Sequence, residues 1–222
     1  MTIARRLTLL LAVPLLVLTA LGFFVVYQLN DIERKGKFVA ETQVGSLAAI
    51  GNIAQRLAEM RVALRTYFLT ENNEEQFRAR DTVRQNAEEL IRLLSRYEDG
   101  LISDDKDYRL FSHFGDLSRE WSNEAKRIIS LAAGRREEGR ALLVKGAFPD
   151  LGTRLGTALS DWIKHNEDLA VSAGKASMEA IQSSARKLLA AIGVSLLLSG
   201  ILGFLTFRRI VHPIRGLQSS VE

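Results

Sequence analysis

The chain has 222 residues, of which 47% are hydrophobic and 25% charged, values that suit one mid-sized globular domain. The charges are unevenly placed, because residues 7–30 and 188–207 contain no Asp, Glu, Lys or Arg. A helix needs about 20 mostly apolar residues to cross the ~30 Å hydrocarbon core of a bilayer. Both stretches reach that length, so the sequence excludes a wholly soluble protein.

The formal net charge of +4 and the pI near 9.5 are also typical of nucleic-acid-binding proteins. The excess charge, however, comes from residues beside the two apolar stretches: Arg5, Arg6, Arg208, Arg209 and Arg215, offset by Glu222. Residues 30–187 contain equal numbers of basic and acidic side chains. Basic residues that flank membrane helices favour the cytoplasmic side. The charge distribution therefore argues against nucleic-acid binding and predicts that both termini are cytoplasmic.

Residues 7–29 are predicted to form the first membrane helix, after a cytoplasmic N-terminus of residues 1–6. The alternative is a cleaved signal peptide, whose apolar core usually spans about 7–15 residues and is followed by a small-residue cleavage site. The apolar run here is longer, and no such site follows the segment Phe23–Tyr27. We therefore expect a retained helix in a two-pass protein of the bacterial inner membrane, with residues 30–187 in the periplasm or outside the cell.

Residues 30–187 show helical periodicity, interrupted by turn-forming residues near positions 70–73, 99–103, 133–134 and 146–149. Between these breaks, apolar residues recur every three or four positions, which indicates amphipathic helices. The four predicted core stripes are Leu47, Ile50, Ile53, Leu57, Met60, Leu64 and Tyr67; Val83, Ala87, Leu90, Leu94 and Tyr97; Leu110, Phe114, Leu117, Trp121, Ile128 and Leu131; and Leu155, Trp162, Leu169, Ala173, Ala176 and Ala180. Such spacing is typical of left-handed helical bundles. We predict an all-α fold, an antiparallel up-down four-helix bundle between two transmembrane helices.

Polar residues at the breaks predict where the bundle helices begin and end. Asn73 and Ser103 can each cap a helix whose first turn is acidic, because a side-chain oxygen there satisfies free backbone N–H groups. Gly100 and Gly134 suit the position that follows a helix. Residues 139–145 are expected to add a short helical segment before the last long helix.

Residues 188–207 are predicted to form the second membrane helix. Small residues recur in it every four positions, at Ser195, Ser199 and Gly203. A stripe of this kind lets helix backbones approach closely inside a membrane. We therefore expect these three residues to contact another membrane helix.

Residues 208–222 carry an apolar seam at helical spacing, with Pro213 in the first turns, where proline is tolerated best. The segment resembles the opening of a HAMP domain, whose first helix typically shows the pattern Ile-x-x-Pro-Ile/Leu-x-x-Leu. The matching residues here are Ile210, Pro213, Ile214 and Leu217. The alternative is an ordinary basic flank with a chance proline. The resemblance implies the start of a HAMP parallel coiled coil, truncated at residue 222, and a receptor fragment without its output module.

Together with the HAMP-like residues 208–222, the chain resembles the four-helix-bundle sensor of methyl-accepting chemotaxis proteins, which also occurs on transmembrane sensor histidine kinases. The segment Gly134–Leu143 is similar to that family's Gly-x-x-x-Glu-Ala-x-x-Leu-Leu region, although Gly139 departs from its helix-favouring pattern. The resemblance implies a homodimeric receptor that detects an extracytoplasmic stimulus and relays it through HAMP to a histidine kinase of a two-component system. The same sensor on a chemoreceptor is the first alternative. A non-signalling, membrane-anchored helical spacer is the second.

The sequence shows no catalytic constellation, and we expect no cofactor and no metal. There is no cysteine for a thiolate zinc site and no Gly-rich phosphate loop. None of the three histidines, His113, His165 and His212, follows a Glu by three residues, as the ligands of di-iron bundles do. Whether the whole protein is an enzyme stays open, because a histidine kinase domain would lie beyond residue 222.

A candidate ligand site is expected in the half of the bundle far from the membrane. Arg61 and Arg65 lie one helical turn apart on the first helix, and a pair of guanidinium groups can clamp a carboxylate. Arg154 is expected at the same height on the last helix, and Trp121 and Trp162 are expected to wall the pocket. The resemblance also implies that Arg61 and Arg65 bind a carboxylate, because first-helix arginines of related chemoreceptors bind amino or organic acids. A periplasmic protein is the alternative stimulus. The alternative is that the arginines pair with exposed Glu or Asp and that the tryptophans belong to the core.

Overall fold

The computed structural model describes residues 3–206 and 208, and every regular element among them is helical. The elements are α1 (Ile3–Lys37), the short π-helix η1 (Phe38–Gln43), α2 (Val44–Leu69), α3 (Asn73–Glu98), α4 (Asp105–Ala132), α5 (Arg136–Val144) and α6 (Ala147–Thr206). The all-α prediction is confirmed. The HAMP-like residues Ile210, Pro213, Ile214 and Leu217 lie outside the described residues.

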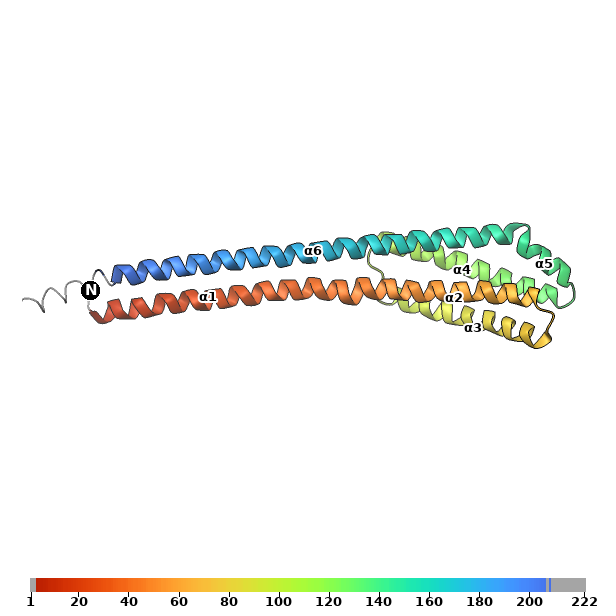
Figure 1. Cartoon of the computed structure of the whole chain (residues 1–222), viewed down its shortest axis with the longest axis horizontal. Helices are drawn as coiled ribbons and strands as arrows, with labels where there is room; N and C mark the ends of the chain where they lie inside the picture. The colour runs from red at the N-terminus through yellow and green to blue at the C-terminus, as the bar shows by residue number, and fades with distance from the viewer. Residues whose placement is uncertain (1–2, 207, 209–222) are drawn as a thin grey trace, which may run out of the picture. The chain divides into compact units, whose positions relative to one another are not determined.

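The chain forms two compact units, one of which is Lys37–Gly174. We call this unit the bundle. It contains η1, α2, α3, α4, α5 and the first part of α6, and the other unit is made of the chain on either side of it. Within the bundle, the four long helices run alongside one another and α5 lies at the end where α6 begins (Figure 1). The predicted four-helix bundle is thereby confirmed.

The bundle core consists mainly of the predicted apolar stripes. Ile53, Phe114 and Leu155, on three different helices, are completely buried. Leu47, Leu94, Leu110 and Leu131 are only partly buried. The last stripe weakens toward its C-terminal end, where Ala173 and Ala180 are half-buried and Ala176 is exposed. The hydrophobic core therefore ends before the end of the bundle unit, and Trp162 is its last fully buried apolar residue.

The predicted caps of two helices are each wrong by one residue, and α5 begins at Arg136, three residues before the predicted segment 139–145. Asn72, not Asn73, caps α3, and its side chain accepts hydrogen bonds from the backbone N–H groups of Glu74 and Glu75. Asp104, not Ser103, caps α4 and accepts from the N–H of Asp107. Both segments contain two adjacent polar residues, and the helical spacing does not decide which of them is the cap. Each acidic first turn still follows its cap as predicted.

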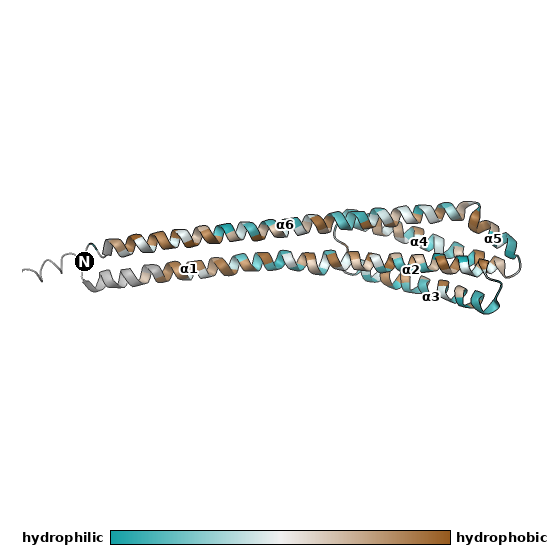
Figure 2. Ribbon diagram, viewed as in Figure 1, coloured by the Kyte–Doolittle hydropathy of each residue, from teal (hydrophilic) through white to brown (hydrophobic). Residues whose placement is uncertain are grey.

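Two stretches of helix are long and apolar enough to cross a membrane, judged by length and composition. They lie within Leu15–Leu69 and Ala147–Phe204. The most apolar 18 residues of these segments have mean hydropathies of 1.7 and 2.0, and none of these residues is buried. The C-terminal part of α6 is almost entirely hydrophobic (Figure 2).

A polar contact lies between the helices of the second unit, where Ser184 Oγ donates a 2.7 Å hydrogen bond to Gln28 Oε1. The small residues predicted to pack in the membrane lie on the same α6 helix. Ser195 is half-buried and donates to the Ala191 carbonyl, whereas Ser199 and Gly203 are exposed.

Candidate functional site

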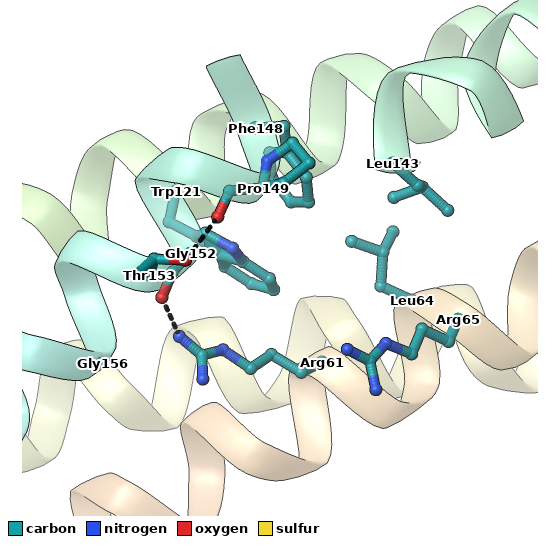
Figure 3. Close-up of a pocket in the computed structure, with 10 residues that line it drawn as sticks. All are labelled: Arg61, Leu64, Arg65, Trp121, Leu143, Phe148, Pro149, Gly152, Thr153 and Gly156. Carbon is teal, nitrogen blue, oxygen red and sulfur yellow. Dashed lines mark hydrogen bonds between the residues drawn. The ribbon is translucent and has the colours of Figure 1, made fainter. Parts of the chain in front are cut away.

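A cavity of about 470 Å³ lies inside the bundle, where α2, α4, α5 and the start of α6 meet (Figure 3). This volume is within the range of small-molecule sites. Its lining residues are Arg61, Leu64 and Arg65 of α2, Trp121 of α4, Leu143 of α5, and Phe148, Pro149, Gly152, Thr153 and Gly156 of α6.

Two guanidinium groups give the cavity its positive charge. Arg61 is half-buried, and its Nη2 donates a 2.6 Å hydrogen bond to the backbone oxygen of Gly152. Burial, together with repulsion from the more exposed Arg65, lowers the pKa of Arg61, although a guanidinium remains charged at any physiological pH. None of the ion pairs among the described residues involves either arginine. The structure therefore shows neither of them paired with Glu or Asp, as the alternative interpretation would require.

The remaining walls of the cavity are largely apolar, with one further hydrogen-bond donor. Trp121 is 2% exposed, and its Nε1 donates to no acceptor among the described residues. A methyl group built on Gly152 would lie 3.8 Å from this nitrogen, so the glycine leaves the indole N–H uncovered on that side. Leu64, Leu143 and Phe148 complete the walls. Two cations and an indole N–H beside an apolar surface fit a small anion with an apolar body.

The five predicted ligand residues divide into two groups. Arg61, Arg65 and Trp121 line the cavity together. Arg154 is exposed and is not among the residues that line it. Trp162 is completely buried elsewhere in the bundle, in a cluster around Asp107.

The cluster around Asp107 is a buried polar network that the sequence analysis did not identify. Asp107 is completely buried, and its carboxylate accepts four kinds of hydrogen bond. The donors are Tyr97 Oη (2.8 and 2.9 Å), Trp162 Nε1 (2.7 Å), Asn166 Nδ2 (2.9 Å) and the backbone N–H of Ser103 (2.8 Å). Burial, and then the hydrogen bond and the negative charge of Asp107, raise the pKa of Tyr97. The network joins α3, α4 and α6 through one carboxylate.

Two further polar contacts lie beside this network, at the connection between α3 and α4. His165 Nε2 lies 3.0 Å from the Asp104 carboxylate. Partial burial raises the pKa of Asp104, but hydrogen bonds from the Asp107 backbone and from His165 outweigh it and lower the pKa. Ser46 Oγ donates to the Leu101 carbonyl at 2.8 Å. The connection between α3 and α4 is therefore fastened to both α2 and α6.

A signal for this network was present in the sequence. Asp107 continues the α4 stripe backwards from Leu110 at the same spacing of three and four, and Asn166 falls between Trp162 and Leu169 of the α6 stripe. A polar residue in line with a core stripe predicts a buried polar group, which must then find hydrogen-bond partners. Among the described residues, no group of three or more His, Asp or Glu is placed to hold a metal ion.

The fold is thus an all-helical bundle that encloses a charged cavity, in a chain with two helices apolar enough to span a membrane. A family model described as a four-helix-bundle sensory module for signal transduction matches residues 1–181, and the chain belongs to this family. No curated protein and no solved structure matches the chain. The family establishes a sensory role in signal transduction.

Proposed function

We propose that the chain is the sensing and membrane-spanning part of a receptor that detects a small organic anion outside the cytoplasm. The observation that carries the proposal is the cavity at Arg61 and Arg65. Two guanidinium groups meet there beside apolar walls, and none of the ion pairs among the described residues involves them. A carboxylate that enters the cavity would gain charge-assisted hydrogen bonds in a partly desolvated site.

In this proposal, residues 7–29 and 188–207 cross the bacterial inner membrane, and residues 30–187 lie outside the cytoplasm. The two apolar helical stretches and the basic residues beside them support this topology. Both termini then face the cytoplasm, which suits a module that passes a signal inward.

The receptor works as a homodimer and relays anion binding through α6 and the HAMP start to a cytoplasmic histidine kinase. The sequence pattern of residues 208–222 supports the HAMP relay, and membership of a sensory family argues against a mere spacer. A chemoreceptor output is the alternative. Residues beyond 222 separate the two, because a helix with a phospho-accepting histidine indicates the kinase and a long Ala/Glu/Gln-rich hairpin indicates the chemoreceptor.

Calorimetry on the full chain in lipid nanodiscs tests the anion site with a panel of small mono- and dicarboxylic acids. We expect one or more acids to bind, and we expect Arg61→Ala and Arg65→Ala each to weaken binding by about 1.5–3 kcal/mol, as for a lost hydrogen bond to a charged group. Arg154→Ala is the matched control, since Arg154 is an exposed arginine that does not line the cavity. It should leave the affinity unchanged.

Two results would contradict the anion proposal. One is a folded chain that binds none of the acids, which would favour a protein stimulus. The other is an equal loss of affinity in Arg154→Ala, which would show that general positive charge, and not the cavity, attracts the acid. Because Arg61 also bonds to Gly152, its variant is checked for unchanged thermal unfolding before its affinity is interpreted.

A further inference from the structure

The α6 wall of the cavity at Arg61 and Arg65 carries two glycines one helical turn apart, Gly152 and Gly156. Both line the cavity, and both lie inside the helix, which begins at Ala147. A glycine inside a helix lowers its stability relative to alanine, because glycine loses more conformational freedom on folding. Two such residues on one face of a helix therefore need an explanation.

Close packing does not explain either glycine. A Cβ atom at Gly152 would lie 3.8 Å from Trp121 Nε1. A Cβ atom at Gly156 would lie 3.8 Å from Arg61 Nη2 and 4.0 Å from Arg61 Nη1. These are ordinary contact distances, so alanine fits at both positions without a clash. Gly139 is the contrasting case, because its Cβ atom would lie 3.0 Å from a buried ring.

The missing methyl groups instead leave hydrogen-bond donors open to the cavity. Arg61 Nη2 is already used, because it donates to the Gly152 carbonyl at 2.6 Å. Arg61 Nη1 and Trp121 Nε1 donate to no acceptor among the residues that the structure describes. Thr153, on the same wall, donates its hydroxyl to the Pro149 carbonyl (Figure 3). The cavity thus offers one cationic and one neutral donor beside the two glycines.

The two open donors lie about one helical turn apart along α6. Gly152 and Gly156 are four residues apart, which is roughly 6 Å along the helix axis, and one donor lies beside each of them. Apolar side chains of Leu64, Leu143 and Phe148 surround the space. A ligand that meets both donors therefore has two acceptor groups joined by a short apolar spacer.

An acid that carries one carboxylate and no other polar group fits this arrangement less well. Its carboxylate can bind Arg61 Nη1 and Arg65, but its apolar tail then faces Trp121 Nε1. The indole N–H loses water from the cavity and gains no acceptor, which weakens binding. Sites that are built to hydrogen-bond a polar group reject analogues that lack it.

We propose that Gly152 and Gly156 determine the specificity of the cavity by keeping these two donors uncovered. The ligand is a small organic acid with a second hydrogen-bond acceptor, such as an oxo group or a second carboxylate, a few atoms from the first. The carboxylate binds Arg61 Nη1 and Arg65, and the second acceptor binds the N–H group of Trp121. The proposal rests on the anion site proposed above, to which it adds the second group of the ligand and the residues that select it.

Calorimetry on the full chain in lipid nanodiscs tests the ligand class with two matched pairs of acids. Pentanoate is compared with its oxo acid levulinate, and benzoate with its para-acetyl derivative. All four carry one negative charge, so charge does not distinguish the members of a pair. We expect the oxo member of at least one pair to bind about ten times more tightly, as for one N–H group that gains an acceptor. Trp121→Phe keeps an aromatic ring and should bind both members of that pair equally.

Two alanine variants test the glycines through opposite effects on stability and on binding. Gly152→Ala and Gly156→Ala should each raise the midpoint of thermal unfolding by about 1–4 °C, because alanine stabilises the helix. Gly152→Ala should nevertheless weaken binding of the oxo acid about tenfold, because its methyl group covers the indole N–H. Gly156→Ala should weaken binding of both members of the pair, because its methyl group covers the guanidinium of Arg61.

Gly115→Ala is the matched control. Gly115 also lies inside a helix, nothing within 4 Å would meet its Cβ atom, and it does not line the cavity. This variant should raise the unfolding midpoint by a similar amount and leave every affinity unchanged. A glycine variant that is stabilised but binds more weakly, beside a control that is only stabilised, supports a role in binding and not in packing.

The outcomes that would overturn this proposal differ from those that would overturn the anion site. Equal binding of both members of each pair by the unmodified chain would overturn the second acceptor, although binding itself would still support the anion site. Unchanged affinities in Gly152→Ala and Gly156→Ala would overturn the role of the glycines. Equal losses of both acids in Trp121→Phe would show that the indole acts by packing alone. Should that variant fail to fold, Gly152→Ala tests the indole N–H by itself. An unmodified chain that binds none of the four acids would overturn both proposals.

Discussion

A buried carboxylate at Asp107 receives hydrogen bonds from residues far apart in the sequence. Its donors lie on α3 (Tyr97), at the start of α4 (Ser103) and on α6 (Trp162 and Asn166). Burial of a charge is costly unless several hydrogen bonds replace its water, and here every donor that Asp107 binds is itself wholly or partly buried. Without the carboxylate, Tyr97 Oη and Asn166 Nδ2 would keep only their longer hydrogen bonds, to Asn166 Oδ1 and to the Trp162 carbonyl, at 3.2 Å each. The residue therefore fixes the relative positions of three helices.

Asp107→Ala is expected to destabilise the bundle by about 3–5 kcal/mol, because it leaves buried donors without an acceptor. Asp107→Asn should destabilise the bundle less than Asp107→Ala does, because the amide keeps one acceptor oxygen. Asp116→Asn on the same helix is the control: Asp116 is exposed and pairs with Arg119, so its loss should change stability by no more than about 0.5 kcal/mol. Tryptophan fluorescence during denaturant unfolding measures all three, because both tryptophans lie in the bundle. Equal stability of Asp107→Ala and the control would contradict the assigned role.

Gly139 shows a different requirement at the scale of one residue, that of close packing. A Cβ atom at this position of α5 would lie 3.0 Å from Phe68 Cε1 and 3.2 Å from the Ala132 side chain. Phe68 is 1% exposed, so its ring has little room to move. The departure of Gly139 from the family's helix-favouring pattern therefore has a steric explanation in this chain.

Gly139→Ala should lower the stability of the bundle by about 1 kcal/mol, because overpacking outweighs the gain in helix propensity. Gly115→Ala tests the propensity effect alone. Gly115 is buried within α4, but nothing within 4 Å would meet its Cβ atom, so this variant should be stabilised by about 0.5–1 kcal/mol. The same fluorescence experiment compares them. A stabilised Gly139→Ala would show that Phe68 repacks freely.

For single residues, the sequence predicted which types of side chain form the site better than it predicted which residues contact one another. Arg61, Arg65 and Trp121 line one cavity, which spacing along a helix could suggest because two of them lie one turn apart. Trp162 bonds instead to Asp107, since its position depends on how α4 and α6 are paired and rotated. That rotation is a tertiary property, and heptad spacing within one helix does not contain it.

At the scale of whole elements, apolar periodicity located each helix, and its breaks located each turn. The short π-helix η1 was not foreseen, because one extra residue per turn leaves the apolar spacing on either side almost unchanged. Its last residue, Gln43, is 1% exposed and donates through Nε2 to Ser103 Oγ at 3.1 Å. The π-helical segment thus ends in a partly buried polar contact with the connection between α3 and α4.

The apolar C-terminal part of α6 offers a test at the same scale. Ser199 and Gly203 are exposed although they belong to a small-residue stripe with Ser195. A stripe of this kind favours close contact with another helix, so we expect Ser199→Cys and Gly203→Cys to cross-link in membranes faster than Leu197→Cys. Leu197 is the control because it is 68% exposed on the same helix outside the stripe. Equal rates at the three positions would show that the stripe is not a packing surface.

At the scale of the whole molecule, the positions of the charged residues and of the two long apolar stretches predict one membrane topology. The hydrophobic core lies within Ile50–Trp162, and the net positive charge lies outside residues 30–187, beside the apolar stretches. A segment with no net charge and its own hydrophobic core is suited to an aqueous compartment, and basic flanks resist transfer across the membrane. We therefore expect Asn123→Cys in the bundle to react with a membrane-impermeant maleimide in intact cells, and Thr2→Cys to react only after the membrane is permeabilised. Mass spectrometry of the same samples should find the N-terminal apolar stretch still attached. Labelling of Thr2→Cys in intact cells would contradict the cytoplasmic N-terminus, and a chain that has lost residues 1–30 would show that the first apolar stretch is a cleaved signal peptide.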